Sequence, residues 1–143
     1  MTGEPGAPGE PYAMVAQLCG RYAHALDGRR WSELTEVFTP DATMEFAHIG
    51  PVTGPEAIGR ICAEALAPLT ASQHLIGSIL VTATGAEPAS VCYFHAQHVR
   101  DGRQFVVAGT YTDTLRQHGD GWRIAHRVQT VTWTAGDSGV VGM

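Results

Sequence analysis

The stretch YAHALDGRRWSELTEVFTPDA, residues 22–42, decides the fold because two helices meet in it and a strand follows it. Apolar side chains recur at three- and four-residue steps up to and into this stretch, which predicts one face of a helix: Val15, Leu18, Cys19, Tyr22 and Leu26. Asp27-Gly28 predicts the end of that helix, since glycine readily takes a left-handed cap. The same spacing predicts a short second helix at Trp31, Leu34, Val37 and Phe38.

Outward from this stretch, helices come first and strands follow. Residues 42–48 can pair as a strand, and a third helix is predicted from Gly54-Pro55 to Pro68. Turn signals divide the β-branched and aromatic remainder into four long antiparallel strands, about 73–84, 89–100, 103–117 and 121–134. Helices grouped before strands predict an α+β fold in which the helices cover one face of a curved sheet.

Size and composition indicate one globular domain. The chain has 143 residues, of which 44% are hydrophobic, and this is enough for a single core. A net charge of −5 and a pI of 5.7 give no basic patch for nucleic acid or an anionic membrane, so neither is an expected partner. The three cysteines are odd in number and lie on apolar faces, which predicts buried, reduced thiols.

The two ends of the chain differ in composition from its middle. Residues 1–10 hold three glycines and two prolines and are predicted to be a flexible tail, residues 11–135 form the domain, and residues 136–143 are a second tail without periodicity. No apolar run approaches the ~20 residues that cross a bilayer. The N-terminus carries Glu4 and Glu10 where a signal peptide needs basic charge, so a cytoplasmic protein is expected.

Four segments resemble the SnoaL-like branch of the nuclear-transport-factor-2-like (NTF2-like) superfamily: residues 22–42, TGPEAIGRI (53–61), QHLIGSILV (73–81) and DGWRIAHR (120–127). The resemblance covers about residues 12–134. It implies a cone in which three N-terminal helices pack on a curved, mainly antiparallel sheet and enclose a cavity. The superfamily includes scytalone dehydratase, a hexachlorocyclohexane dehydrochlorinase, bile-acid dehydratases, polyketide cyclases, ketosteroid isomerases and binding modules without catalysis, so the resemblance implies fold more firmly than chemistry.

The resemblance also implies catalytic residues. Asp27 and His74 stand where the dehydratase and dehydrochlorinase group places its catalytic Asp–His pair. Tyr22 resembles the tyrosine of the bile-acid dehydratases, and Arg127 resembles an arginine shared by those enzymes and the dehydrochlorinase. His98 matches the second histidine of scytalone dehydratase once a one-residue gap is allowed.

The chain departs from the family at four positions. Leu26 and Phe46 replace the two tyrosines that scytalone dehydratase directs at its substrate. Tyr22 replaces the lysine of the dehydrochlorinase, and Ser72 replaces its cysteine. Neither scytalone nor a chlorinated ring is therefore the expected substrate.

The residue types suit an elimination without a cofactor. His74 would take a proton from carbon while Asp27 fixes its tautomer and stabilises the imidazolium. The leaving hydroxyl would receive a proton from Tyr22, His98 or a water that they hold. Arg127 would bind a carboxylate or steady an oxyanion.

Strand alternation predicts the walls of the cavity. If His98 points inward, Phe94 does too, and Trp133 shares the face of Arg127. The predicted substrate-contacting residues are Phe46, Phe94, Tyr111 and Trp133. Tyr22 and Asp27 are five residues apart, about 140° around a helix, so they converge only if the helix ends before Asp27.

Structural roles remain open for the same residues. Asp27 could simply end a helix, Tyr22 and His98 could be core residues, and Arg127 could pair across the sheet with Asp113 or Glu45. No short cluster of His, Cys or Asp has the spacing of metal ligands, so no metal is expected.

The sequence therefore predicts a cofactor-independent lyase, of dehydratase type, for a small hydrophobic cyclic substrate such as a polyketide, terpenoid or steroid-like compound. An isomerase or cyclase with the same base is the alternative. A binding module without catalysis and a small subunit of a ring-hydroxylating dioxygenase are two others. A homodimer or homotrimer is expected, with the outward stripe of Tyr93, His95 and Gln97 at the contact.

Overall fold

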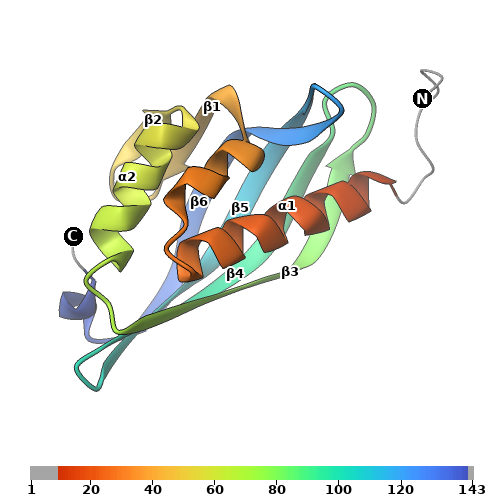
Figure 1. Cartoon of the computed structure of the whole chain (residues 1–143). Coiled ribbons are helices and arrows are strands. Elements are labelled where there is room, and N and C mark those ends of the chain that lie inside the picture. The colour runs from red at the N-terminus through yellow and green to blue at the C-terminus, as the bar shows by residue number, and fades with distance from the viewer. Residues whose placement is uncertain (1–9, 142–143) are drawn as a thin grey trace.

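A computed structural model describes residues 10–141 of the chain (Figure 1). Three helical elements come early in the chain, namely the helix α1 (Glu10–Asp27), the 3₁₀ helix η1 (Trp31–Glu36) and the helix α2 (Pro55–Leu66). The sheet is built from β1 (Phe38–Phe46), β2 (Gly50–Thr53), β3 (Ala71–Ala83), β4 (Ala89–Arg100), β5 (Arg103–His118) and β6 (Gly121–Gly136), and a short 3₁₀ helix, η2 (Ser138–Val140), follows it. Within the described residues, no helix combines the length and apolar character needed to cross a membrane.

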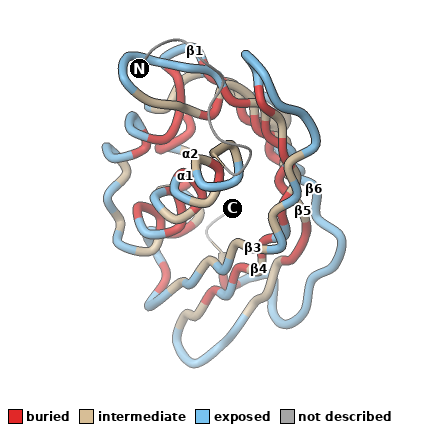
Figure 2. The backbone as a smooth tube through the Cα atoms, turned by 90° about the vertical axis from the view of Figure 1, so that its right-hand side faces the viewer, coloured by how far each residue is buried: buried red, intermediate tan, exposed pale blue. Residues whose placement is uncertain are grey.

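The sheet has six strands in the order β2-β1-β6-β5-β4-β3. Neighbouring strands are antiparallel, except for β1 and β6, which run parallel to each other. Figure 2 shows the sheet curving around α1 and α2. The predicted α+β cone, with its helices on one face of a curved and mainly antiparallel sheet, is confirmed.

The core lies between α1 and the concave face of the sheet. The helix buries the apolar positions that its spacing predicted, including Val15, Leu18, Tyr22 and Leu26. Strand β4 alternates as a half-buried strand should, with inward residues at Cys92, Phe94, Ala96 and His98. The inward direction predicted for His98 and Phe94 is therefore confirmed.

The first helix ends differently from the prediction. The left-handed residue is Arg29, with φ 60°, and Gly28 is not in that conformation. The amide of Arg30 donates to Ala25 O at 2.8 Å and that of Arg29 to Leu26 O at 3.1 Å, which is the Schellman pattern with arginine at the position that glycine normally takes. Asp27 is the last helical residue, so the helix does not end before it.

A bulge in β6 overturns the predicted direction of Trp133. Gly109 pairs with Val131 and Ala108 with Trp133, so Thr132 is an extra residue on β6. Val131 borders the interior, whereas Trp133 lies on the outer face of the sheet. The alternation on which the prediction relied holds only up to the bulge.

The C-terminal segment is not a free tail. Strand β6 continues to Gly136, and η2 then places Val140 in the core with no exposed surface. Asp137 anchors this segment through an ion pair with Arg103 at 2.8 Å. The predicted tail at 136–143 is wrong as far as residue 141, because an apolar side chain returns to the core. Of the predicted tail at 1–10, residues 1–9 lie outside the described part, and Glu10 begins α1.

Shortening Val140 tests this anchor. Val140→Ala removes two methyl groups from a fully buried position, which should lower the free energy of unfolding by about 1.5 kcal/mol. Ile49→Ala, at a residue that is 42% exposed, should change it by less than about 0.5 kcal/mol. Urea unfolding measures both, and equal effects would show that the segment does not stabilise the fold.

Candidate active site

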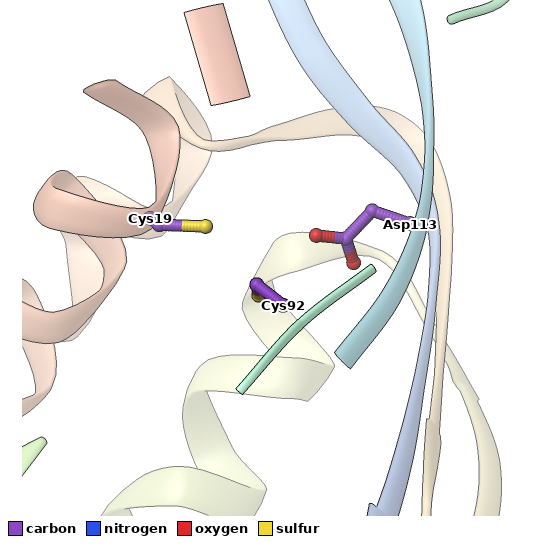
Figure 3. A group of neighbouring side chains, drawn as sticks. All are labelled: Cys19, Cys92 and Asp113. Atoms are coloured by element: carbon purple, nitrogen blue, oxygen red, sulfur yellow. The ribbon is translucent and has the colours of Figure 1, made fainter. Parts of the chain in front are cut away.

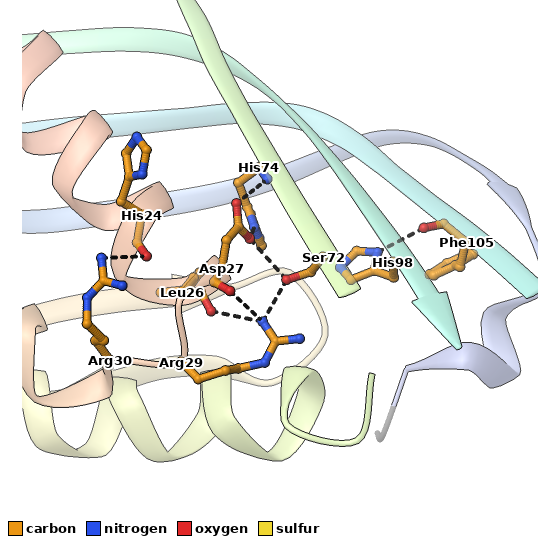
Figure 4. A network of polar contacts seen from close by, with 9 residues as sticks. All are labelled: His24, Leu26, Asp27, Arg29, Arg30, Ser72, His74, His98 and Phe105. Carbon is orange, nitrogen blue, oxygen red and sulfur yellow. Dashed lines mark hydrogen bonds and ion pairs between the residues drawn. The ribbon is translucent and has the colours of Figure 1, made fainter. Parts of the chain in front are cut away.

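Asp27 and His74 meet where the end of α1 crosses the start of β3. The Nδ1 atom of His74 lies 2.7 Å from Oδ1 of Asp27, and the backbone amide of His74 donates to Oδ2 at 2.8 Å (Figure 4). The Ser72 hydroxyl also donates to Oδ1, at 3.0 Å. The carboxylate thus receives three hydrogen bonds from one short stretch of strand, which fixes its orientation.

These contacts define the charge and the tautomer of the pair. Burial alone raises the pKa of Asp27, but the hydrogen bonds from His74 and Ser72 outweigh it and hold the pKa below its ordinary value. The ionised carboxylate can only accept, so Nδ1 of His74 carries the proton. The other ring nitrogen, Nε2, then presents its lone pair, and no described residue occupies it through a hydrogen bond.

His74 borders a cavity of about 410 Å³ that is lined mainly by apolar side chains. Its side chain is 7% exposed, whereas that of Asp27 is 23% exposed and does not line the cavity. The histidine therefore presents the pair to the cavity. Of the predicted site residues, the cavity is lined by Tyr22, Phe46, His74, Phe94, His98 and Tyr111.

His98 reaches the same cavity from β4. Its ring lies edge-on to that of His74, with 6.1 Å between the ring centroids. Its Nδ1 is 2.9 Å from the Phe105 carbonyl oxygen, which can only accept, so Nδ1 carries the proton. Burial lowers the pKa of His98, which favours the neutral ring. A neutral His98 offers an acceptor at Nε2 and is poorly suited to protonate a leaving group.

Tyr22 lies in the cavity wall, one and a half helical turns before Asp27. Its hydroxyl donates a weak hydrogen bond to the sulfur of Met44 at 3.9 Å. Burial raises the pKa of Tyr22 well above its ordinary value, so the phenol keeps its proton. Tyr22 and Asp27 do not converge directly, but both belong to the site because His74 extends from Asp27 into the cavity.

Arg127 sits behind the cavity wall and does not line it. It is fully buried, and its Nε and Nη2 atoms donate to the two carboxylate oxygens of Asp113 at 2.8 and 2.9 Å. Its guanidinium carbon is 4.6 Å from the ring centroid of Tyr22 and 4.1 Å from that of Tyr111. Arg127 therefore forms the ion pair with Asp113 across the sheet, which is the alternative interpretation. Both tyrosine rings pack against its buried cation.

Two thiols lie next to this ion pair. Cys19, Cys92 and Asp113 come from α1, β4 and β5, and their ligand atoms all lie within 4.8 Å of one another (Figure 3). The cysteines are buried and unbridged, as predicted. Asp113 is already held on both oxygens by Arg127, whose Nη2 is 3.5 Å from Cys19 Sγ. The guanidinium thus provides the positive charge of this cluster, which disfavours a metal cation there.

Some residues of the site are not predicted by the sequence. Gln129 and His48 line the cavity, and His48 is at the same time exposed. Ser72 and Arg29 lie behind Asp27, and Ser72 stands out in the sequence only as a departure from the dehydrochlorinase. Neither strand alternation nor a position in a turn indicates that these four residues belong to a site, so their place is seen only in the folded structure.

The arrangement can remove a proton from a bound carbon acid. Nε2 of His74 accepts the proton, and Asp27 stabilises the resulting imidazolium. Tyr22 keeps its proton and can donate a hydrogen bond to a departing oxygen.

Breaking the buried ion pair between Arg127 and Asp113 should destabilise the folded protein. Asp113→Asn leaves the Arg127 charge without its partner, which should lower the free energy of unfolding by about 3–5 kcal/mol. The double variant Arg127→Met/Asp113→Leu should recover most of that loss, because it removes both charges. Asp41→Asn, in an exposed pair with Arg116, serves as the control and should leave the denaturation midpoint unchanged. An Asp113→Asn protein as stable as the wild type would contradict this role of the pair.

Comparisons with known proteins show the family and the fold. An uncharacterized protein of Mycobacterium tuberculosis is 31% identical over 120 residues, covering 81% of this chain and 82% of the relative. A candidate scytalone dehydratase from Novosphingobium aromaticivorans has a TM-score of 0.76 at 18% identity, with 87% of this chain and 85% of that one covered.

The hexachlorocyclohexane dehydrochlorinase LinA-type3 from Novosphingobium barchaimii has a TM-score of 0.77 at 14% identity, with 92% of each chain covered. At these identities the two structures establish a shared fold. The model of the SnoaL-like domain matches residues 10–128, which is most of the chain. The protein belongs to the SnoaL-like domain family.

Proposed function

We propose that this protein is a cofactor-independent lyase that removes water from a small, hydrophobic, cyclic substrate. The observation that carries the proposal is the 2.7 Å contact between His74 and Asp27 at the wall of an apolar cavity of about 410 Å³. This volume falls within the range of small-molecule sites. Two proteins of the same fold are named for eliminations, a dehydrochlorinase and a candidate scytalone dehydratase.

In the proposed reaction, His74 takes a proton from a carbon next to a carbonyl group through Nε2. The electron pair moves to form a carbon–carbon double bond, and the hydroxyl on the neighbouring carbon leaves as water after protonation. Tyr22 lines the cavity and stays protonated, because burial raises its pKa, so it donates a hydrogen bond to the departing oxygen, and the His74 imidazolium returns the proton. His98 accepts a hydrogen bond from a substrate hydroxyl at Nε2 and orients the ring.

Arg127 has a supporting part in this proposal. Its charge is already met by Asp113, so it does not select a substrate carboxylate. It holds the rings of Tyr22 and Tyr111 in the cavity wall instead. The expected substrate is therefore uncharged.

An isomerase or cyclase would use the same base and differ in the step after proton removal. Product analysis separates these reactions, because only dehydration releases water and lowers the substrate mass by that amount. A binding module without catalysis is less well supported, since it has no need of an ionised carboxylate that fixes the tautomer of a histidine at the cavity wall.

Substitutions in the pair test the proposal. Asp27→Asn and His74→Ala should each lower turnover of cyclic hydroxy-ketones by about 10²–10⁴-fold, because each removes a placed part of the base. The new conjugated double bond is followed by its absorbance. Asp41→Asn and His118→Ala make the same chemical changes at exposed positions and should retain turnover. Wild-type turnover in both site variants would rule out the mechanism.

The outer face of the sheet supports a proposal for assembly. A groove of about 560 Å³ runs over Gly77 and Gly109, beside the exposed side chains of Leu75, Tyr93 and Trp133. Among the described residues that line this groove, none is Asp, Glu, Lys or Arg. We propose that a second copy of the chain covers this face, because an uncharged patch with both a hollow and protruding rings can fit itself without bringing together like charges from a chain of net charge −5.

A charge in the middle of this face should prevent assembly. Trp133→Asp is expected to convert a homodimer into a monomer in size-exclusion chromatography with light scattering, since the contact would bury an unpaired carboxylate. Tyr12→Asp places the same charge on an exposed aromatic residue of α1 and should leave the oligomer intact. A Trp133→Asp protein of unchanged mass would exclude this face as the contact.

A further inference from the structure

Behind the Asp27–His74 pair, two polar side chains continue the hydrogen-bond network away from the cavity. Nη1 of Arg29 lies 2.8 Å from the Ser72 hydroxyl oxygen, and that hydroxyl lies 3.0 Å from Oδ1 of Asp27 (Figure 4). The same Nη1 is 3.0 Å from the carbonyl oxygen of Leu26. The network therefore joins the end of α1 to the first residues of β3.

The direction of each hydrogen bond is set by the chemistry of the groups. A guanidinium has only donors, so Ser72 must accept from Arg29. The single proton of the hydroxyl is then free for the carboxylate of Asp27, which can only accept. The chain of bonds runs from Arg29 to Ser72 to Asp27, and His74 donates to Asp27 from the other side. Arg29 thus prevents Ser72 from turning its proton elsewhere.

The backbone of Arg29 indicates that its side chain is needed. A residue other than glycine in the left-handed region costs of order 1 kcal/mol or more and persists where the surroundings require it. The position is the one that glycine normally takes in this helix ending, and Gly28 stands directly before it. Among the described residues, no carboxylate forms an ion pair with Arg29, so its main polar contacts are Ser72 and the helix carbonyls.

We propose that Arg29 and Ser72 are positioning residues for the base, and that they hold the Asp27 carboxylate so that Nδ1 of His74 keeps its proton and Nε2 faces the cavity. This inference rests on the proposed function for its meaning in catalysis. The hydrogen-bond geometry itself can be tested without a substrate. Neither residue lines the cavity, so they act through Asp27 rather than on the substrate.

The first measurement uses the ligand-free protein with ¹⁵N-labelled histidine. In the wild type, the Nδ1 proton of His74 should be a resolved resonance that exchanges slowly with water. Ser72→Ala and Arg29→Gly should each accelerate this exchange about tenfold or more, the equivalent of losing one hydrogen bond to a charged group. Ser72→Thr keeps the hydroxyl and should restore the wild-type rate.

Arg29→Gly separates positioning from simple helix capping. Glycine suits the left-handed conformation, so this variant should melt at or above the wild-type temperature. Arg30→Ala is the matched control, because Arg30 also donates to a carbonyl of the last helical turn, His24 O at 3.3 Å, and has no contact with Ser72. Arg30→Ala should leave the exchange rate of the His74 Nδ1 proton unchanged. If Arg29→Gly also leaves this exchange rate unchanged, Arg29 only caps the helix and the inference is overturned.

Turnover provides the second readout and separates this inference from the proposed function. With an active substrate, Arg29→Gly and Ser72→Ala should lower kcat about 10–100-fold with little change in KM, because the substrate contacts remain. If no substrate is converted by the wild type while the proton exchange still responds, the network stands and the proposed function fails. Wild-type kcat together with wild-type exchange in both variants would overturn the network.

Discussion

The buried pair of Arg127 and Asp113 is the constraint around which the other parts of the structure are arranged. It lies across β5 and β6, where the two residues are register partners, and both side chains are fully withdrawn from solvent. A charge in such a place must be neutralised, and the bidentate contact does so. The guanidinium also contacts the rings of Tyr22 and Tyr111 and the thiol of Cys19, so α1 and the cavity wall take their positions from it.

Much of this architecture could be predicted from the sequence because its signals are local. The apolar spacing of Val15 to Leu26 defines the buried face of α1, and turn residues divide the four long strands close to their observed ends. The pairing of Asp27 with His74 is different, because 47 positions separate them. That prediction came from family resemblance, since no periodicity brings the end of a helix to the start of a particular strand.

Other features of the structure could not be predicted, because each depends on the local geometry or the tertiary contacts of a single residue. The inserted Thr132 reverses the direction of Trp133, and alternation alone cannot indicate which strand carries an extra residue. The left-handed Arg29 stands beside a glycine that any sequence rule would choose for that conformation. Likewise, Arg127 looks like a ligand for an anion until the fold places Asp113 opposite it. Each of these features is decided by tertiary contacts.

The bulge at Thr132 changes which residues of β6 face the cavity and which face the outer groove. Before it, Gln129 and Val131 border the cavity, and directly after it Trp133 belongs to the outer groove. An inserted or deleted residue in this part of β6 would exchange the two sets of side chains without altering any of them. A change of one residue in the length of this segment would therefore alter the wall of the cavity and the outer groove at the same time.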